Sequence, residues 1–188
     1  MITGKIKFPL SKNGHKCCRG TYVDFIGINY YTRNIAEFVL SPSNLFYNLK
    51  CDKALDKNDL GWDIYPKGIY WVCKKYYERY KLPIYITENG ISDKRDAKRP
   101  NFIVNHLAYI AKAIDEGIDI QRYYHWTLMD NFEWLEGETA NFGIYHCNFE
   151  NQKRTMRPSG KLYSMICKEK KLTDEMLMEF FETWDFKN

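Results

Sequence analysis

Three stretches of the chain combine β-branched and aromatic residues with polar neighbours in the short pattern that predicts a β-strand. They are residues 24–31, 83–88 and 121–130. The second stretch ends in a lone carboxylate, Glu88, and Asn89-Gly90 predicts a turn directly after it. A carboxylate at the end of a buried strand is costly unless it is paired or has a chemical role. From the pattern alone, a salt bridge and a catalytic role for Glu88 both stay open.

Longer stretches place apolar residues at every third or fourth position, which predicts amphipathic helices. The helices are expected to begin at Pro66, Asn101, Ser159 and Thr173. Pro83 would end the first helix and Gly117 would cap the end of the second, whereas the hydroxyl of Ser159 would cap the start of the third. The second helix is expected to turn one face inward, formed by Ile103, Leu107, Ile110, Ala111 and Ile114.

The order of strand, helix, strand, helix, strand, helix predicts an α/β fold with parallel strands. Long loops, residues 32–65 and 131–157, are expected after the first and third strands, where functional residues commonly lie. A doubly wound sheet and part of an eight-stranded barrel share this order. No glycine-rich phosphate loop follows any of the strands, which weakens a nucleotide-binding interpretation.

Composition excludes several classes of function. With 28 basic and 24 acidic residues the net charge is +4, too small and too scattered for a nucleic-acid-binding surface. Six cysteines show no spacing typical of a zinc site, so free thiols are expected, with no metal and no cofactor. The chain shows neither a membrane-spanning run nor the apolar segment of a signal peptide, so no membrane partner and a cytoplasmic location are expected. Residues 1–20 are expected to form a flexible basic leader, and residues 21–188 the folded part.

Three long motifs carry a family resemblance. DFIGINYYTR (24–33), the segment from GWDIYP to LPIYITENG (61–90), and the segment from HWTLMDNFEWLEG to GKLY (125–163) resemble the carboxyl-terminal part of the glycoside hydrolase family 1 β-glucosidases. The resemblance implies a (β/α)8 TIM barrel and retaining hydrolysis of β-glycosides. The three strands match the sixth, seventh and eighth strands of that barrel, so the expected fold is a partial barrel.

The resemblance also assigns roles to single residues. Glu88 matches the catalytic nucleophile and Tyr31 the tyrosine that donates a hydrogen bond to it. The positions that match sugar-binding residues are Asn29, Trp126, Glu133, Trp134 and Phe142. Glu133-Trp134 resembles the branch of the family that acts on unphosphorylated sugars. Core packing for the two tryptophans and a solvated loop position for Glu133 are the alternatives.

One part of the catalytic machinery is absent from the sequence. The family's general acid/base is a glutamate in an Asn-Glu-Pro motif on the fourth strand, and this chain has no such motif. An isolated chain is therefore expected to be inactive, or to need a complementary amino-terminal half or copies of itself to act on a β-glycoside or oligosaccharide. A non-catalytic carbohydrate-binding or interaction module, and a truncated product without function, are the alternatives.

Overall fold

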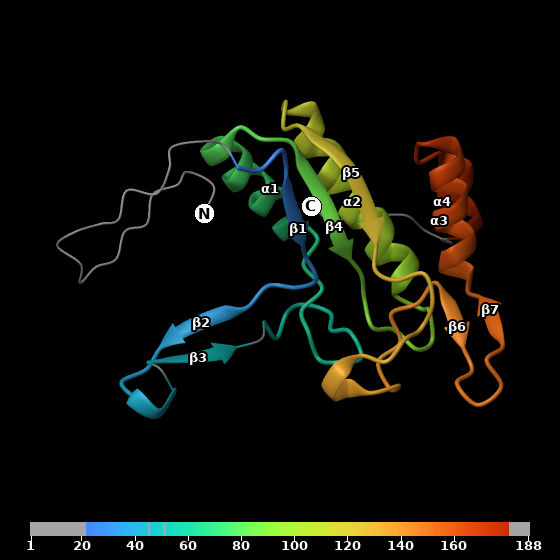
Figure 1. Cartoon of the computed structure of the whole chain (residues 1–188), viewed down its shortest axis with the longest axis horizontal. Helices are drawn as coiled ribbons and strands as arrows, with labels where there is room; N and C mark the ends of the chain where they lie inside the picture. The colour runs from blue at the N-terminus through green and yellow to red at the C-terminus, as the bar shows by residue number, and fades with distance from the viewer. Residues whose placement is uncertain (1–21, 45, 51, 181–188) are drawn as a thin grey trace.

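Three parallel strands form the centre of the structure, a computed structural model that describes residues 22–44, 46–50 and 52–180. β1 (Ile26–Asn29) and β5 (Ile120–His125) pair on either side of β4 (Ile84–Asn89). All three strands run in one direction, so their carboxyl ends meet at the same edge of the sheet (Figure 1). The predicted parallel α/β order is confirmed. The predicted leader, residues 1–20, lies outside the described residues.

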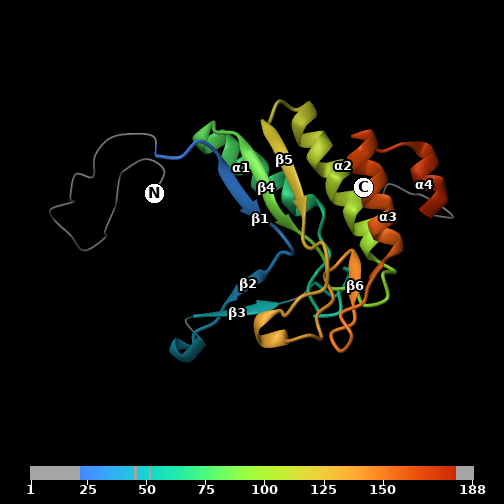
Figure 2. The same cartoon turned by 45° about the vertical axis from the view of Figure 1, so that its right-hand side comes forward.

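The crossovers between these strands contain helices. α1 (Lys67–Tyr80) lies between β1 and β4 in the chain, and α2 (Arg99–Asp115) lies between β4 and β5. Both helices pack against the same face of the sheet, and α3 (Pro158–Glu169) packs beside α2 (Figures 1 and 2). The described part of the chain ends in α4 (Asp174–Phe180). None of the helices in this part combines the length and the apolar character needed to cross a membrane.

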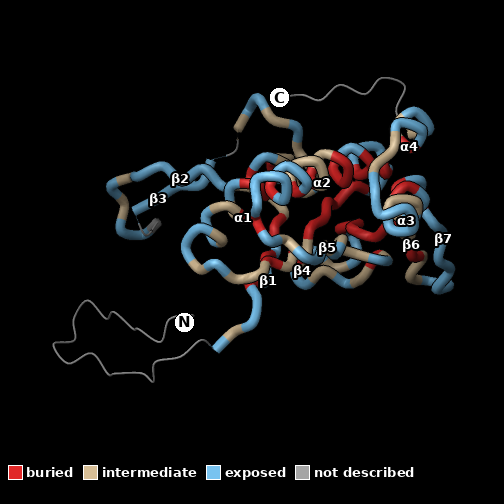
Figure 3. The backbone as a smooth tube through the Cα atoms, turned by 90° about the horizontal axis from the view of Figure 1, so that it is seen from above, coloured by how far each residue is buried: buried red, intermediate tan, exposed pale blue. Residues whose placement is uncertain are grey.

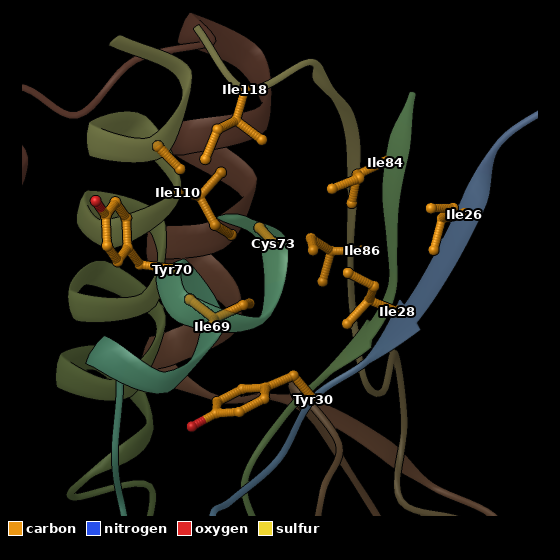
Figure 4. Packing of buried hydrophobic residues seen from close by; sticks show 11 residues of the cluster. Ile26, Ile28, Tyr30, Ile69, Tyr70, Cys73, Ile84, Ile86, Ile110 and Ile118 are labelled. Atoms are coloured by element: carbon orange, nitrogen blue, oxygen red, sulfur yellow. The ribbon is translucent and has the colours of Figure 1, made fainter. Parts of the chain in front are cut away.

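The core fills the space between the sheet and these two helices. Ile84 and Ile86 of β4 are fully buried beside Ile26 and Ile28 of β1, because alternate side chains of a strand point to the same face. The helices contribute Ile69, Tyr70 and Cys73 from α1 and Ile110 and Ala113 from α2 (Figure 4). The outward side chains of the strands, such as Asn29 and Tyr124, lie on the other face, which no described element covers. The sheet is therefore open and does not close into a barrel.

Both predicted long loops contain regular structure. The elements are β2 (Ile35–Phe38), η1 (Pro42–Asn44) and β3 (Tyr47–Lys50) in the first, and η2 (Trp134–Glu136), β6 (Tyr145–Cys147) and β7 (Arg154–Met156) in the second. The strands form two antiparallel ribbons, β2–β3 and β6–β7. The prediction of loops was wrong at these positions, because strands of three or four residues are too short to show a clear alternation in the sequence.

One predicted strand end and one predicted helix face were also wrong. β5 ends at His125 rather than at Asp130, because the chain leaves β4 after Trp126 and bonds to the segment before β6: the N–H of Thr127 donates to the carbonyl of Phe142 at 3.2 Å. In α2, Ala111 and Ile114 face solvent, although a helical pattern had placed them inward. Packing against the sheet uses a narrower stripe of α2 than its apolar residues cover.

A network of buried charges joins the starts of α2 and α3. The guanidinium of Arg99 is completely buried, pairs with Asp96, and donates to the carbonyl of Asn141 at 2.7 Å. Asp96 also accepts the backbone N–H of Ser159 at 2.8 Å and its hydroxyl at 2.6 Å. The hydroxyl of Ser159 therefore does not cap α3 as predicted, because it donates to Asp96 instead. Breaking a buried pair of this kind typically costs about 3–5 kcal/mol.

We predict that Ile110→Ala lowers the free energy of unfolding by about 2–4 kcal/mol, because it leaves a cavity between α2 and the sheet. Ile114→Ala makes the same change four residues later on the exposed face, and should lower the free energy of unfolding by less than about 1 kcal/mol. Urea unfolding followed by circular dichroism compares the two variants. Equal losses would contradict this assignment of the inner face of α2.

Candidate active site

Glu88 lies at the carboxyl end of β4, the central strand of the sheet. Asn29 of β1 is its partner across the strand pair. The register shifts just before Asn29 and passes over Thr87, an irregularity that re-aims side chains in a strand. The hydroxyl of Thr87 donates to the side-chain oxygen of Asn29 at 2.6 Å. The predicted nucleophile and the predicted Asn29 are therefore held side by side.

Tyr31 follows β1 and reaches the carboxylate of Glu88. Its hydroxyl donates to Oε2 of Glu88 at 2.6 Å. Burial raises the pKa of Tyr31 far above its ordinary value, and the hydrogen bond to Glu88 and the negative charges of Glu88 and Glu133 raise the pKa further. Tyr31 is therefore protonated at neutral pH and acts as a hydrogen-bond donor. The bond fixes the orientation of the carboxylate.

An aromatic cluster lies beside this pair. The ring of Tyr31 meets Phe142 edge-on at 5.9 Å between centroids and Trp62 at 6.3 Å, and Trp62 lies 6.1 Å from Phe142. Phe142 is buried, whereas Trp62 is partly exposed. Trp62 was missed as a site residue by sequence reasoning, although Gly61-Trp62 begins the GWDIYP motif within the long first connection. A tryptophan within a mostly polar connecting segment was the signal that could have identified it as a site residue.

Trp126 and Glu133 form a second pair near the end of β5. The indole N–H of Trp126 donates to Oε1 of Glu133 at 3.1 Å. The backbone N–H of Trp126 donates to the carbonyl of Asn89 at 2.9 Å, which places this pair beside the residue that directly follows Glu88. The structure therefore brings six of the predicted residues to one end of the sheet: Glu88, Tyr31, Asn29, Trp126, Glu133 and Phe142.

Trp134 is the predicted site residue that is not brought into this group. It is the first residue of η2, its backbone is left-handed at φ 48°, and its side chain is 85% exposed. Its neighbours Phe132 and Leu135 are also exposed. Core packing is therefore excluded for Trp134 among the described residues. The loop presents this indole ring to solvent next to Glu133.

Asn89 connects the three strands directly behind Glu88. Its amide donates to the carbonyl of Tyr30 at 2.7 Å and accepts the hydroxyl of Tyr123 at 2.9 Å, and its carbonyl accepts the N–H of Trp126 at 2.9 Å. A side chain at Gly90 would collide with the backbone, because a Cβ there would lie 1.8 Å from the carbonyl oxygen of Trp126. The Asn-Gly pair is therefore required by cross-strand contacts as well as by the turn.

The loop that carries Glu133 is held by a buried ion pair. Both nitrogens of the Arg157 guanidinium donate to the carboxylate of Asp130 at 2.9 Å. The N–H groups of Gly143 and Cys147 donate to the same carboxylate at 2.9 and 3.3 Å. Burial alone would raise the pKa of Asp130, but the hydrogen bonds and charge of Arg157 outweigh it and hold the pKa below its ordinary value.

The arrangement suits covalent chemistry on a molecule with a flat, hydroxyl-bearing face. Glu88 is a fixed carboxylate at the end of a strand, Tyr31 orients it, and the Trp126–Glu133 pair offers an aromatic ring beside a hydrogen-bond acceptor. Among the residues that the structure describes, no group of three or more His, Cys, Asp and Glu side chains could hold a metal ion.

Comparison with known proteins decides the family. The model of the family described as glycosyl hydrolase family 1 matches residues 7–172. This chain belongs to glycosyl hydrolase family 1. It is 34% identical to a β-galactosidase of Sulfolobus acidocaldarius over 82% of this chain and 33% of that protein. It is 38% identical to β-glucosidase A of Thermotoga maritima over 81% of this chain and 36% of that protein.

A solved structure agrees with this result for the fold. The chain superposes on a β-glycosidase from Pyrococcus horikoshii with a TM-score of 0.84 and 37% identity, over 95% of this chain and 41% of that one. The predicted partial TIM barrel is confirmed: this family 1 chain holds three strands of such a barrel, which stay open. The chain spans about a third of the length of the curated relatives it matches.

Two histidines whose ring nitrogens are covered lie beneath the site. His106 of α2 is fully buried, and its Nδ1 lies 2.7 Å from the carbonyl of Phe102. His125 ends β5 and packs against the ring of Tyr163 at 5.5 Å. Burial lowers the pKa of each to about 3, and for His125 the positive charge of Arg99 lowers the pKa further. Both histidines are therefore neutral in the folded protein at neutral and mildly acidic pH.

We predict that the free energy of unfolding falls as the pH is lowered from 6.5 to 5. In this range the unfolded chain binds protons on His106 and His125 and the folded chain does not, because their folded pKa values are about 3. The loss should be about 2 kcal/mol for each histidine. Urea unfolding at several pH values measures the slope, which His106→Gln should reduce. An unchanged slope in that variant would count against a neutral buried His106.

Proposed function

We propose that this chain is the carboxyl-terminal, nucleophile-bearing part of a retaining β-glycosidase that hydrolyses O-glycosyl bonds. The observation that carries the proposal is the 2.6 Å hydrogen bond from Tyr31 to Glu88 at the end of the central strand. Family 1 membership supports it, since similar proteins are named β-galactosidase and β-glucosidase. The activity of the whole protein is part of the proposal, because the chain covers about a third of those relatives.

Glu88 would act as the nucleophile. In a retaining glycosidase an ionised carboxylate attacks the anomeric carbon, the bond to the leaving oxygen breaks, and a covalent glycosyl–enzyme intermediate forms. Water then attacks that carbon and releases the sugar and the free carboxylate. The hydrogen bond from Tyr31 would hold one carboxylate oxygen in place, so that the other is aimed at the sugar.

The Trp126–Glu133 pair would bind the sugar. One oxygen of Glu133 accepts the indole N–H of Trp126, and its carboxylate would also accept hydrogen bonds from sugar hydroxyls. The ring of Trp126 would pack against the apolar face of the sugar. A carboxylate at this position would repel a phosphate group, so the proposed substrates are unphosphorylated β-glycosides or oligosaccharides. The exposed Trp134 would complete the pocket only once the remainder of a barrel surrounds it.

A second carboxyl group is needed for turnover on ordinary substrates. Retaining hydrolysis uses two carboxyl groups about 5–5.5 Å apart, one attacking and one protonating the leaving oxygen. The family resemblance assigns this second carboxyl group to the glutamate of an Asn-Glu-Pro motif, and the sequence contains no such motif. We propose that the amino-terminal part of a family 1 barrel supplies it. Without that part, the chain would at best react with substrates whose leaving group needs no acid.

We predict that an activated 2-deoxy-2-fluoro-glucoside labels Glu88. Its good leaving group removes the need for the acid, and the fluorine slows hydrolysis of the intermediate. Intact mass measurement should show one added sugar, and peptide mapping should place it on Glu88. Tyr31→Phe should slow labelling about 10–100-fold, because a hydrogen bond to a charged group contributes about 1.5–3 kcal/mol.

Tyr70→Phe is the matched control for this experiment. It removes a hydroxyl that also donates to a carboxylate at 2.6 Å, from α1 to Glu116, on the side of the sheet away from Glu88. Labelling at an unchanged rate is expected in this variant. A folded chain that takes no label would favour the alternative of a carbohydrate-binding module without turnover. Labelling of a different carboxylate would show that Glu88 is not the nucleophile.

We predict that adding the amino-terminal part of a family 1 barrel, with its Asn-Glu-Pro motif, restores hydrolysis of an unactivated aryl β-glucoside. General acid catalysis typically contributes about 10²–10⁴-fold, so the rate should rise by at least about two orders of magnitude over either part alone. Glu88→Ala in the restored pair should abolish the activity. Release of the aryl group is followed by absorbance. Normal activity with Glu88→Ala would show that a different residue attacks the sugar.

A further inference from the structure

The β2–β3 ribbon extends away from the rest of the molecule. It leaves the carboxyl end of β1 and points away from α3 and α4 (Figures 1 and 2). All eight residues of its two strands are exposed, and Figure 3 shows both strands in the exposed colour. A two-stranded ribbon on its own is at best marginally stable in water. The ribbon therefore differs from the packed strands of the sheet and raises the question of what covers it.

The register of the ribbon divides its residues between two faces. Cross-strand partners share a face, and successive pairs alternate between faces. One face holds the pairs Ile35–Lys50 and Glu37–Asn48, with an ion pair of 2.5 Å between Lys50 and Glu37. The other face, which we call the apolar face, holds the pairs Ala36–Leu49 and Phe38–Tyr47. The ribbon is therefore amphipathic, with charges on one side and apolar residues on the other.

The apolar face is strongly exposed. The exposed fraction is 74% for Phe38, 58% for Leu49 and 45% for Tyr47, and the adjoining residues Leu40 and Phe46 are 87% and 46% exposed. None of these residues belongs to the core between the sheet and the helices. Contiguous apolar side chains next to a charged face typically mark an interaction site.

We propose that the apolar face of the ribbon is an interface between two copies of this chain. A twofold interface joins the same patch from both copies, so the patch must complement itself. An apolar face without charges satisfies this condition, whereas the Glu37–Lys50 face keeps its charges in water. This interface goes beyond the proposed glycosidase function and does not depend on Glu88.

The exposed apolar area limits the size of the interface. If a large apolar side chain has about 200 Å² of surface, the five exposed side chains offer roughly 600 Å² in each copy. Two copies would bury on the order of 1,200 Å², which is at the low end for a specific interface. Interfaces of this size are typical of weak or transient complexes, so we expect a reversible dimer, with a dissociation constant in roughly the micromolar range, rather than a permanent one.

The test is sedimentation velocity of the purified chain from about 1 µM to about 100 µM, a range that brackets micromolar affinity. The unmodified chain should shift from monomer to dimer as its concentration rises. Leu49→Glu places a charge on the apolar face and should weaken the dimer at least tenfold. Ile35→Glu is the matched control, because it makes the same kind of change on the opposite face, across from Lys50. The control should dimerise like the unmodified chain.

Three results would overturn the proposal. A chain that stays monomeric throughout the range has no such interface, and the ribbon would be left for another partner, such as the missing part of a barrel. Equal weakening by both variants would indicate repulsion between added charges. An unchanged dimer with Leu49→Glu would place the contact elsewhere, for example at the open edges of β1 and β5. Hydrogen exchange of the unmodified chain gives a second measurement, since residues 35–50 should exchange more slowly at high concentration.

Discussion

The hydrogen bonds of Asn89 hold the functional end of this structure together. From the central strand, its amide donates to β1 at Tyr30 and accepts from β5 at Tyr123, while its carbonyl holds Trp126. An amide side chain both donates and accepts, which an aspartate or a leucine cannot do in the same place. Losing one of these bonds would leave a buried polar group unpaired, at a cost of about 1–3 kcal/mol. Glu88 directly precedes Asn89, so the position of the proposed nucleophile follows from this contact.

Buried ion pairs hold the connecting segments between the strands and helices in place. Arg99 with Asp96 joins the starts of α2 and α3, and Arg157 with Asp130 fixes the segment before Glu133. Each charge has several hydrogen-bond partners, as burial requires. Regular packing between the sheet and helices supplies the rigid base, whereas these pairs place the loops relative to it. The proposed sugar-binding residues are thereby supported by polar contacts, and the nucleophile by strand pairing.

The described helices cover only one face of the central sheet. The other face and the edges of β1 and β5 have no described neighbour. Unpaired strand edges are ready templates for pairing with another chain. The similar proteins are about three times as long, and this chain matches about a third of each. The exposed Trp134 and the apolar face of the β2–β3 ribbon are, like the uncovered face of the sheet, surfaces suited to contact with a neighbouring chain.

The sequence by itself determined the order of the three central strands and the helices, the parallel α/β class, the family and Glu88 at the end of a strand. These features depend on the spacing of neighbouring residues, which periodic patterns and motifs record. The tertiary structure alone decided that Trp62 joins Tyr31 and Phe142, that Trp134 stays in solvent, and that Asp96 takes the hydroxyl of Ser159. It also sorted the ribbon residues into a charged and an apolar face. These features are contacts and register between residues far apart in the chain, and local periodicity carries no information about such distances.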